Sequence, residues 1–149
     1  MEGYDDDYPT CADTFATLRF YHEACTPDAV TEALGISPSR TQAKGQNTVN
    51  GKQVQRRVSG WFLCSRDEVQ SKDIRRHIDW ILDQVSELRN EFVRLNQEGW
   101  RSDISCYWLS HGHGGPMLSP SQMESLAKLN LTCGFDVYFE EDSAEAPAS

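Results

Sequence analysis

The chain has 149 residues, of which 38% are hydrophobic and 10% aromatic, and its formal net charge is -9. This length and composition suit one domain with a hydrophobic core, and they exclude a membrane-spanning helix because no apolar run approaches the ~20 residues required. Since MEGYDDDYPT also lacks the apolar stretch of a secretion signal, we expect a soluble, cytoplasmic protein.

The negative charge is concentrated at the two ends of the sequence. Residues 1–13 and 140–149 contain the excess of aspartate and glutamate, whereas acidic and basic residues balance in residues 14–139. We therefore predict two acidic, disordered tails on either side of a single domain. Because that domain has no excess of positive charge, we do not expect a nucleic acid as its partner.

The first predicted element is a strand at residues 14–21, TFATLRFY. In this alternating pattern Leu18 and Phe20 point to one face, and Arg19 and Tyr21 point to the other. Such a pattern is typical of a strand that is buried on one side only.

A short helix and a loop are expected next. Thr26 can cap a helix that begins with Pro27, and Gly35 can end it. Residues 38–53, PSRTQAKGQNTVNGKQ, are polar and rich in turn-forming residues, so we predict a long mobile loop there.

Alternation resumes in residues 54–65, VQRRVSGWFLCS. The pattern indicates a second strand, with Arg57 and Trp61 on the same face. We assign both residues to the outer face, although an aromatic side chain such as Trp61 also suits the interior.

The clearest pattern is found in residues 71–98. Their apolar residues recur at alternating intervals of four and three, at Ile74, Ile78, Ile81, Val85, Leu88, Phe92 and Leu95. This stripe predicts one long helix that covers the sheet, with Ser71 at its start and Gly99 directly after its end.

Two further strands and a helix complete the chain. Residues 102–110 and 131–139 alternate and are predicted to be strands, and Ser119 with Pro120 can start a helix between them. The residues of the last strand that we expect to face inward are Leu131, Cys133, Phe135, Val137 and Phe139.

The order of elements is therefore β-α-β, a long helix, then β-α-β. This order predicts the α+β class, with a mixed sheet of four or five strands and helices mainly on one face. We expect each β-α-β unit to make a right-handed crossover.

Several short motifs together are familiar: LGISPSR, the strand SGWFLCS, the helix end EGW and the closing segment LSPSQMESLAKLNLTCGFDVYF. With these motifs the chain resembles a bacterial family known as domain of unknown function 4279, over roughly residues 13–140. The resemblance implies the fold and class but no catalytic residue. His111 and His113 are not part of the family pattern.

The segment SHGHGGP, residues 110–116, is the stretch that most suggests chemistry. Histidines at positions i and i+2 of a strand share a face and can bind a metal together. His111, His113 and His22 are therefore the candidate ligands of a metal-dependent enzyme or sensor. The glycines favour a plain loop instead, and the segment lacks the lysine of a phosphate-binding Walker loop.

No arrangement for nucleophilic catalysis is recognisable in the sequence. It contains no G-x-S-x-G motif. Its five cysteines are odd in number and have no C-x-x-C spacing, which is typical of reduced thiols in a cytosol. We therefore favour a domain that is not an enzyme, and we expect no cofactor.

The remaining candidate is the outer face of the sheet, which we expect to bind another protein. The predicted partner-binding residues are Arg19, Tyr21, Arg57, Trp61, Tyr107 and Tyr138, with Asp136 beside them. Tyr, Trp and Arg are the residue types that anchor protein interfaces. Analogy with small acidic proteins of bacteria and phages suggests an inhibitor or immunity-type role. The alternative is a homodimer that uses the same face or an edge strand.

Overall fold

The computed structural model describes residues 3–140, and at its centre is a five-stranded sheet with the strand order β2-β5-β1-β6-β7. These strands are β1 (Cys11–His22), β2 (Arg40–Gln42), β5 (Ser59–Cys64), β6 (Arg101–Ser110) and β7 (Thr132–Phe139). Strand β1 runs antiparallel to β5 and β6, β2 runs antiparallel to β5, and β7 runs parallel to β6. The sheet is therefore mixed, which confirms the predicted α+β class.

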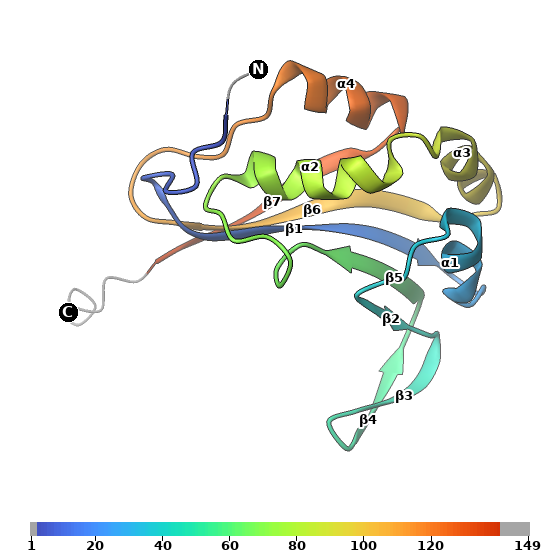
Figure 1. Ribbon diagram of the computed structural model, residues 1–149. Helices are drawn as coiled ribbons and strands as arrows, with labels where there is room; N and C mark the ends of the chain where they lie inside the picture. Colours follow the sequence, from blue (N-terminus) through green and yellow to red (C-terminus); the bar gives the residue numbers. More distant parts are fainter. Residues whose placement is uncertain (1–2, 141–149) are drawn as a thin grey trace.

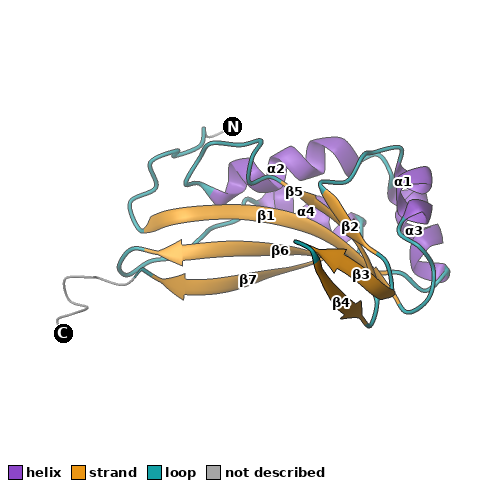
Figure 2. Cartoon of the chain, turned by 90° about the horizontal axis from the view of Figure 1, so that it is seen from below, coloured by secondary structure: helices purple, strands orange, loops and turns teal. Residues whose placement is uncertain are grey.

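Within residues 3–140, four helices lie on one face of this sheet (Figures 1 and 2). They are α1 (Asp28–Leu34), α2 (Ile74–Val85), α3 (Arg89–Gln97) and α4 (Pro120–Lys128). Strands β6 and β7, with α4 between them, form a parallel β-α-β unit as predicted. The first predicted unit is different, because β1 and β5 are antiparallel and no parallel crossover forms between them.

The single helix predicted for residues 71–98 is two helices, α2 and α3. The carboxylate of Asp73 caps α2 by accepting a hydrogen bond from the Arg75 N–H. The apolar stripe continues across the break, so its spacing does not reveal where α2 ends. The turn between the helices brings the Phe92 ring of α3 to 5.3 Å from the Phe20 ring of β1, measured between centroids.

The loop predicted for residues 38–53 contains β2, β3 (Gly45–Val49) and the start of β4 (Lys52–Arg56), and β3 and β4 form a hairpin. The single strand predicted for residues 54–65 is divided between the end of β4 and β5. Asn50 and Gly51 form the turn of the hairpin, with φ angles of 52° and 78°. Asn-Gly is the preferred sequence for a two-residue turn with positive φ at both positions. This local signal outweighs the polar composition that predicts a loop. The hairpin projects from the side of the sheet away from the helices (Figure 1).

The core lies between the sheet and the helices. Trp61, Trp108 and Phe20 are its largest sheet residues, and each is at most 1% exposed. The indole N–H of Trp61 donates a hydrogen bond to the Thr31 hydroxyl of α1 at 3.0 Å. The assignment of Trp61 to the outer face is therefore wrong. Alternation shows which residues of a strand share a face, but it does not show which face is covered.

The residues before β1 also contact the domain. The Tyr8 ring packs edge-on against Trp108 of the core, with centroids 5.6 Å apart. The Tyr8 hydroxyl donates a hydrogen bond to the Gly115 carbonyl at 2.7 Å, which ties this segment to the loop between β6 and α4.

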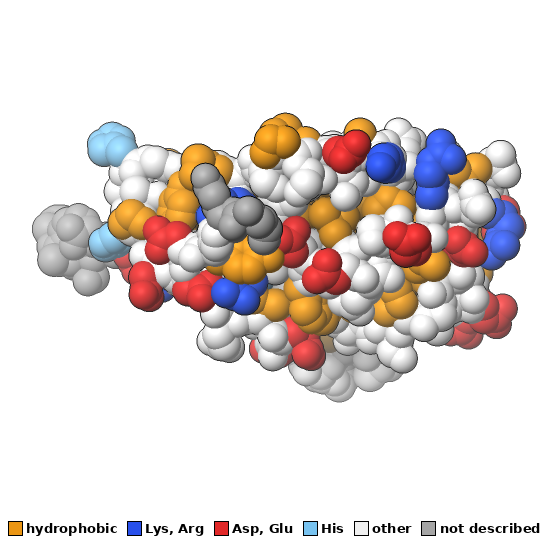
Figure 3. Space-filling view, turned by 45° about the horizontal axis from the view of Figure 1, so that its top comes forward, with side chains coloured by type: hydrophobic (Ala, Val, Ile, Leu, Met, Phe, Trp, Pro, Cys, Tyr) orange, Lys and Arg blue, Asp and Glu red, His pale blue; other side chains and the backbone are white. Residues whose placement is uncertain are grey.

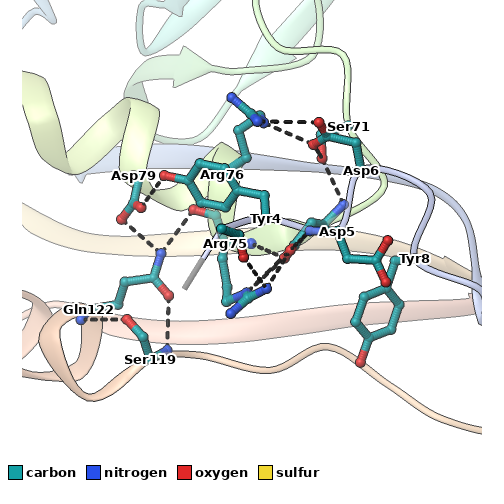
Figure 4. A network of polar contacts seen from close by, with 12 residues as sticks. Tyr4, Asp5, Asp6, Tyr8, Ser71, Arg75, Arg76, Asp79, Ser119 and Gln122 are labelled. Carbon is teal, nitrogen blue, oxygen red and sulfur yellow. Dashed lines mark hydrogen bonds and ion pairs between the residues drawn. The ribbon is translucent and has the colours of Figure 1, made fainter. Parts of the chain in front are cut away.

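Acidic side chains near the N-terminus are paired with groups of α2 (Figure 4). Asp6, for example, forms an ion pair with Arg76 at 2.9 Å. The disordered tail predicted for residues 1–13 thus differs from the structure from residue 3 onward, because its charges find partners on the helix side. Residues 141–149, most of the second predicted tail, lie outside the described residues.

Strand β7 forms one edge of the sheet, and its predicted burial is wrong beyond Cys133. Phe135, Val137 and Phe139, which we expected to face inward, are 37%, 47% and 74% exposed. The side chains of β7 do alternate between the two faces of the sheet, as predicted. An edge strand has a neighbour on one side only, so its side chains stay accessible where the helix layer above them ends.

Candidate functional site

The face of the sheet turned away from the helices, the open face, carries two rows of aromatic and arginine side chains. The first row crosses the sheet through Tyr138, Tyr107, Phe15 and Arg66. The second row consists of Arg19, Tyr21, Phe62 and Arg40. Both rows arise from alternation, which sends every second side chain of neighbouring strands to the same side.

In the first row, three rings contact one another from one strand to the next, the first pair stacked and the second tilted by 37°. Phe15 and Tyr107 are directly opposite each other on β1 and β6, and their centroids are 5.0 Å apart with the rings nearly parallel. The Tyr138 ring of β7 lies 5.5 Å from that of Tyr107. At the other end, the Arg66 guanidinium lies 5.3 Å from the centre of the Phe15 ring. The charge of Asp136 raises the pKa of the Tyr138 hydroxyl.

In the second row, arginines flank two rings. The Arg40 guanidinium of β2 lies 4.0 Å from the centre of the Phe62 ring, which packs edge-on against Tyr21 at 5.6 Å. Arg19 lies 5.5 Å from the Tyr21 ring and donates two hydrogen bonds of 2.8 Å to the Asp103 carboxylate. The hydrogen bonds to Asp103 raise the pKa of Arg19.

At the β5 end of the two rows, a hollow of about 600 Å³ opens between Arg40 and Arg66. Its lining residues are Phe15, Thr17, Ser39, Arg40, Phe62, Cys64, Arg66, Asp67 and Glu68. Thr17 and Cys64 are directly opposite each other on β1 and β5 and form its floor. The hollow therefore has a polar floor and, at its sides, two guanidinium groups that lie beside aromatic rings.

The structure brings most of the predicted partner-binding residues together. Arg19, Tyr21, Tyr107 and Tyr138 all lie on the open face, and Asp136 lies on the same side of β7 as Tyr138. Trp61 points to the opposite side. Arg57 is exposed in the connection between β4 and β5 and belongs to neither row.

Four members of the rows were not among the predicted residues: Phe15, Phe62, Arg40 and Arg66. Phe15 and Phe62 follow the alternation of Arg19 and Tyr21 once the covered face is known. Arg40 lies in the segment predicted as a loop, and Arg66 follows the last residue of β5. The pairing of β2 with β5 places Arg40 over the Phe62 ring, and Arg66 reaches the Phe15 ring from the turn after β5.

The three candidate metal ligands are not brought together. Strands β1 and β6 are antiparallel, so His22 at the end of β1 lies where β6 begins, whereas His111 follows the last residue of β6. The ten residues of β6 span roughly 33 Å at about 3.3 Å each. Among residues 3–140 no group of three or more His, Cys, Asp or Glu side chains could hold a metal ion.

The rings of His22 and His111 also have protein partners. His22 uses both nitrogens: Nδ1 accepts from the Ala24 and Cys25 amides, and Nε2 donates to the Glu98 carbonyl at 2.9 Å. His111 Nδ1 lies 2.6 Å from a carboxylate oxygen of Glu140.

A serine–histidine pair that the sequence did not indicate lies under the helices. The Ser65 hydroxyl is 2.6 Å from His77 Nδ1, and His77 Nε2 donates to the Ser71 carbonyl at 2.8 Å. The pair resembles the first two members of a catalytic triad, but Ser65 is 0% exposed and also accepts from the Ala16 N–H. Burial lowers the pKa of His77. A substrate has no access to this serine, so the pair supports the fold.

On the helix side, the described residues include a polar network between the N-terminal segment, α2 and α4 (Figure 4). Acidic, basic and apolar groups are interspersed over the helices (Figure 3). None of the helices within residues 3–140 is both long and apolar enough to cross a membrane.

The fold and this face define a small α+β domain with one side of its sheet uncovered by helices. Residues 12–140 match the family model described as a domain of unknown function, DUF4279, and the chain belongs to this family. No match was found among curated proteins or among solved structures.

Proposed function

We propose that this chain is a non-enzymatic, cytoplasmic domain that binds another protein through the open face. The observation that carries the proposal is the row of contacting rings formed by Tyr138, Tyr107 and Phe15, which ends at Arg66. Tyrosine and arginine are enriched among the residues that dominate binding energy. Rings that already pack against one another lose little conformational freedom when a partner covers them.

The shape around the open face supports the same proposal. The β3–β4 hairpin projects from this side of the sheet, as seen in Figure 1, and can contact a partner seated on the face. The hairpin contributes polar side chains, and the rows contribute apolar surface. A polar rim around an apolar centre is the usual anatomy of a protein interface.

The experiment is affinity capture of a partner with the full chain, followed by binding measurements with variants. Tyr107→Ala combined with Tyr138→Ala removes two rings of the first row, and we expect affinity for the captured protein to fall at least tenfold. The matched control is Val93→Ala with Met123→Ala, which removes two exposed apolar side chains from the helix side. Equal affinities for both double variants would contradict the proposal.

Self-association through the edge of the sheet is a second candidate function. Strand β7 exposes Phe135, Val137 and Phe139 as well as one unpaired edge of its backbone. Unprotected edge strands can pair with a second copy of themselves. Light scattering should then report a dimer that Val137→Lys converts to a monomer. A monomer at high concentration of the unaltered chain would exclude this candidate.

A further inference from the structure

We infer that the hollow between Arg40 and Arg66 binds a single carboxylate, supplied by an aspartate or glutamate side chain of the partner protein. This inference rests on the proposed function and specifies the chemistry of one part of the partner.

The first argument is the state of the two guanidinium groups. The Arg40 guanidinium lies 4.0 Å from the centre of the Phe62 ring, and the Arg66 guanidinium lies 5.3 Å from the centre of the Phe15 ring, so both groups lie beside an aromatic ring of the open face. Among the described residues neither forms an ion pair or a hydrogen bond. A guanidinium stacked on a ring keeps its N–H donors in the plane of the group, where they match the two oxygens of a carboxylate.

The second argument is the floor between them. Thr17 contributes a hydroxyl, and the Ser39 hydroxyl already accepts from the Cys64 N–H at 2.8 Å. The volume of about 600 Å³ admits a side chain together with part of its backbone. A carboxylate entering here would replace its hydrogen bonds to water with hydrogen bonds from one or both guanidinium groups. Aromatic rings lie beside these groups, and charge-assisted hydrogen bonds are stronger in such apolar surroundings.

The third argument concerns the charged groups that line the hollow. Asp67 and Glu68 also line the hollow, and neither forms an ion pair with Arg40 or Arg66. Their two negative charges balance the formal charge of the two arginines. Attraction to the arginines and repulsion from the acids both grow with the charge of the ligand, so the shape of the anion decides. The two coplanar oxygens of a carboxylate match the planar fork of a guanidinium.

The test is a nuclear magnetic resonance titration of the ¹⁵N-labelled full chain with N-acetylglutamic acid α-amide. We expect the side-chain Nε–H signals of Arg40 and Arg66 to shift and to saturate with one common Kd. The neutral N-acetylglutamine amide should cause no such shift. Shifts that grow without saturation, or that are equal for the two compounds, would overturn the inference.

Variants of the two arginines and a titration with inorganic phosphate make the test more specific. Arg40→Gln or Arg66→Gln should weaken binding of the glutamic acid probe at least about tenfold, since each removes charge-assisted hydrogen bonds. Arg66→Lys keeps the charge but loses the planar fork, so its loss should be smaller. Arg57→Gln is the control and should leave the Kd unchanged. Tighter saturable binding of inorganic phosphate would overturn the choice of a carboxylate.

The titration can fail independently of the proposed function. The double variant Tyr107→Ala with Tyr138→Ala leaves every residue that lines the hollow in place, so it should bind the probe like the unaltered chain while losing the partner. Loss of partner binding in that variant, without any probe binding in the unaltered chain, would leave the open face as the interface and reject only the carboxylate site.

Discussion

Trp108 and Tyr107 are neighbours on β6, yet they face opposite sides of the sheet. Trp108 is 1% exposed beneath the helices, where it meets Tyr8. Tyr107 is half-buried on the open face, where its ring contacts Phe15 and Tyr138. The covered face uses aromatic volume to fill the core, whereas the open face arranges its rings in rows that range from Tyr138, which is 51% exposed, to Phe62, which is 4% exposed beneath Arg40. The comparison separates residues that hold the fold from residues that are available to a partner.

The largest expected effect comes from removing a ring on the covered face. Trp108→Ala should lower the free energy of unfolding by about 3–5 kcal/mol, because a buried indole leaves a cavity. Tyr107→Ala, one position away on the open face, should cost about 1 kcal/mol or less, since only cross-strand contacts are lost. Urea denaturation of both variants measures the difference. Similar losses for the two would break the distinction between the faces.

The second-largest expected effect on the free energy of unfolding comes from the Ser65–His77 pair, which is buried on the covered side. Ser65→Ala removes the partners of His77 Nδ1 and of the Ala16 N–H, and a buried unpaired group costs about 1–3 kcal/mol. Ser105 is the matched control, because it is a half-buried serine on the open side of β6. Ser105→Ala should change stability by less than about 0.5 kcal/mol. A loss at Ser105 as large as that at Ser65 would contradict the assignment of the two sides.

The same pair makes stability depend on pH. Burial lowers the pKa of His77 below its ordinary value of 6.5, so the unfolded chain takes up a proton that the folded chain does not. Stability should therefore be full above pH 6.5 and should fall as the pH drops from 6.5 toward the folded pKa, by at most about 1.4 kcal/mol per pH unit. The lowered pKa values of Asp6 and Asp73 act only below their ordinary value of 3.8.

Denaturation curves between pH 5 and 7 test this dependence. His77→Gln cannot take up a proton, so its stability should change less over this interval than that of the unaltered chain. An unchanged slope in the variant would show that another group is responsible.

The sequence predicts the covered face better than the open one. Alternation places Leu18 and Phe20 together correctly, and the apolar stripe shows which side of α2 is buried. It does not show that Trp61 faces inward, because a strand with aromatic residues on both sides fits either orientation. That information comes from the strand order and the position of the helices, which depend on contacts far apart in the sequence.

Prediction of the candidate site depends even more on contacts between residues that are far apart in the sequence. Arg19 and Tyr21 can be found from one strand, since they alternate with core residues. Arg40 can be found only once β2 is paired with β5, which puts it opposite Phe62. The β3–β4 hairpin escaped prediction for a different reason. Asn50-Gly51 is a local turn signal, but the polar composition of its surroundings favoured a loop.

The smallest expected effect lies on the open face, at the ion pair between Arg19 and Asp103. About a third of each side chain is exposed, so solvent screens the pair and the two groups should contribute together at most about 1 kcal/mol. A double-mutant cycle with Arg19→Gln and Asp103→Asn measures the coupling. It should shrink in 1 M salt, where the screening length falls to about 3 Å. A coupling above 2 kcal/mol that salt does not change would mean that the open face is as rigidly built as the covered one.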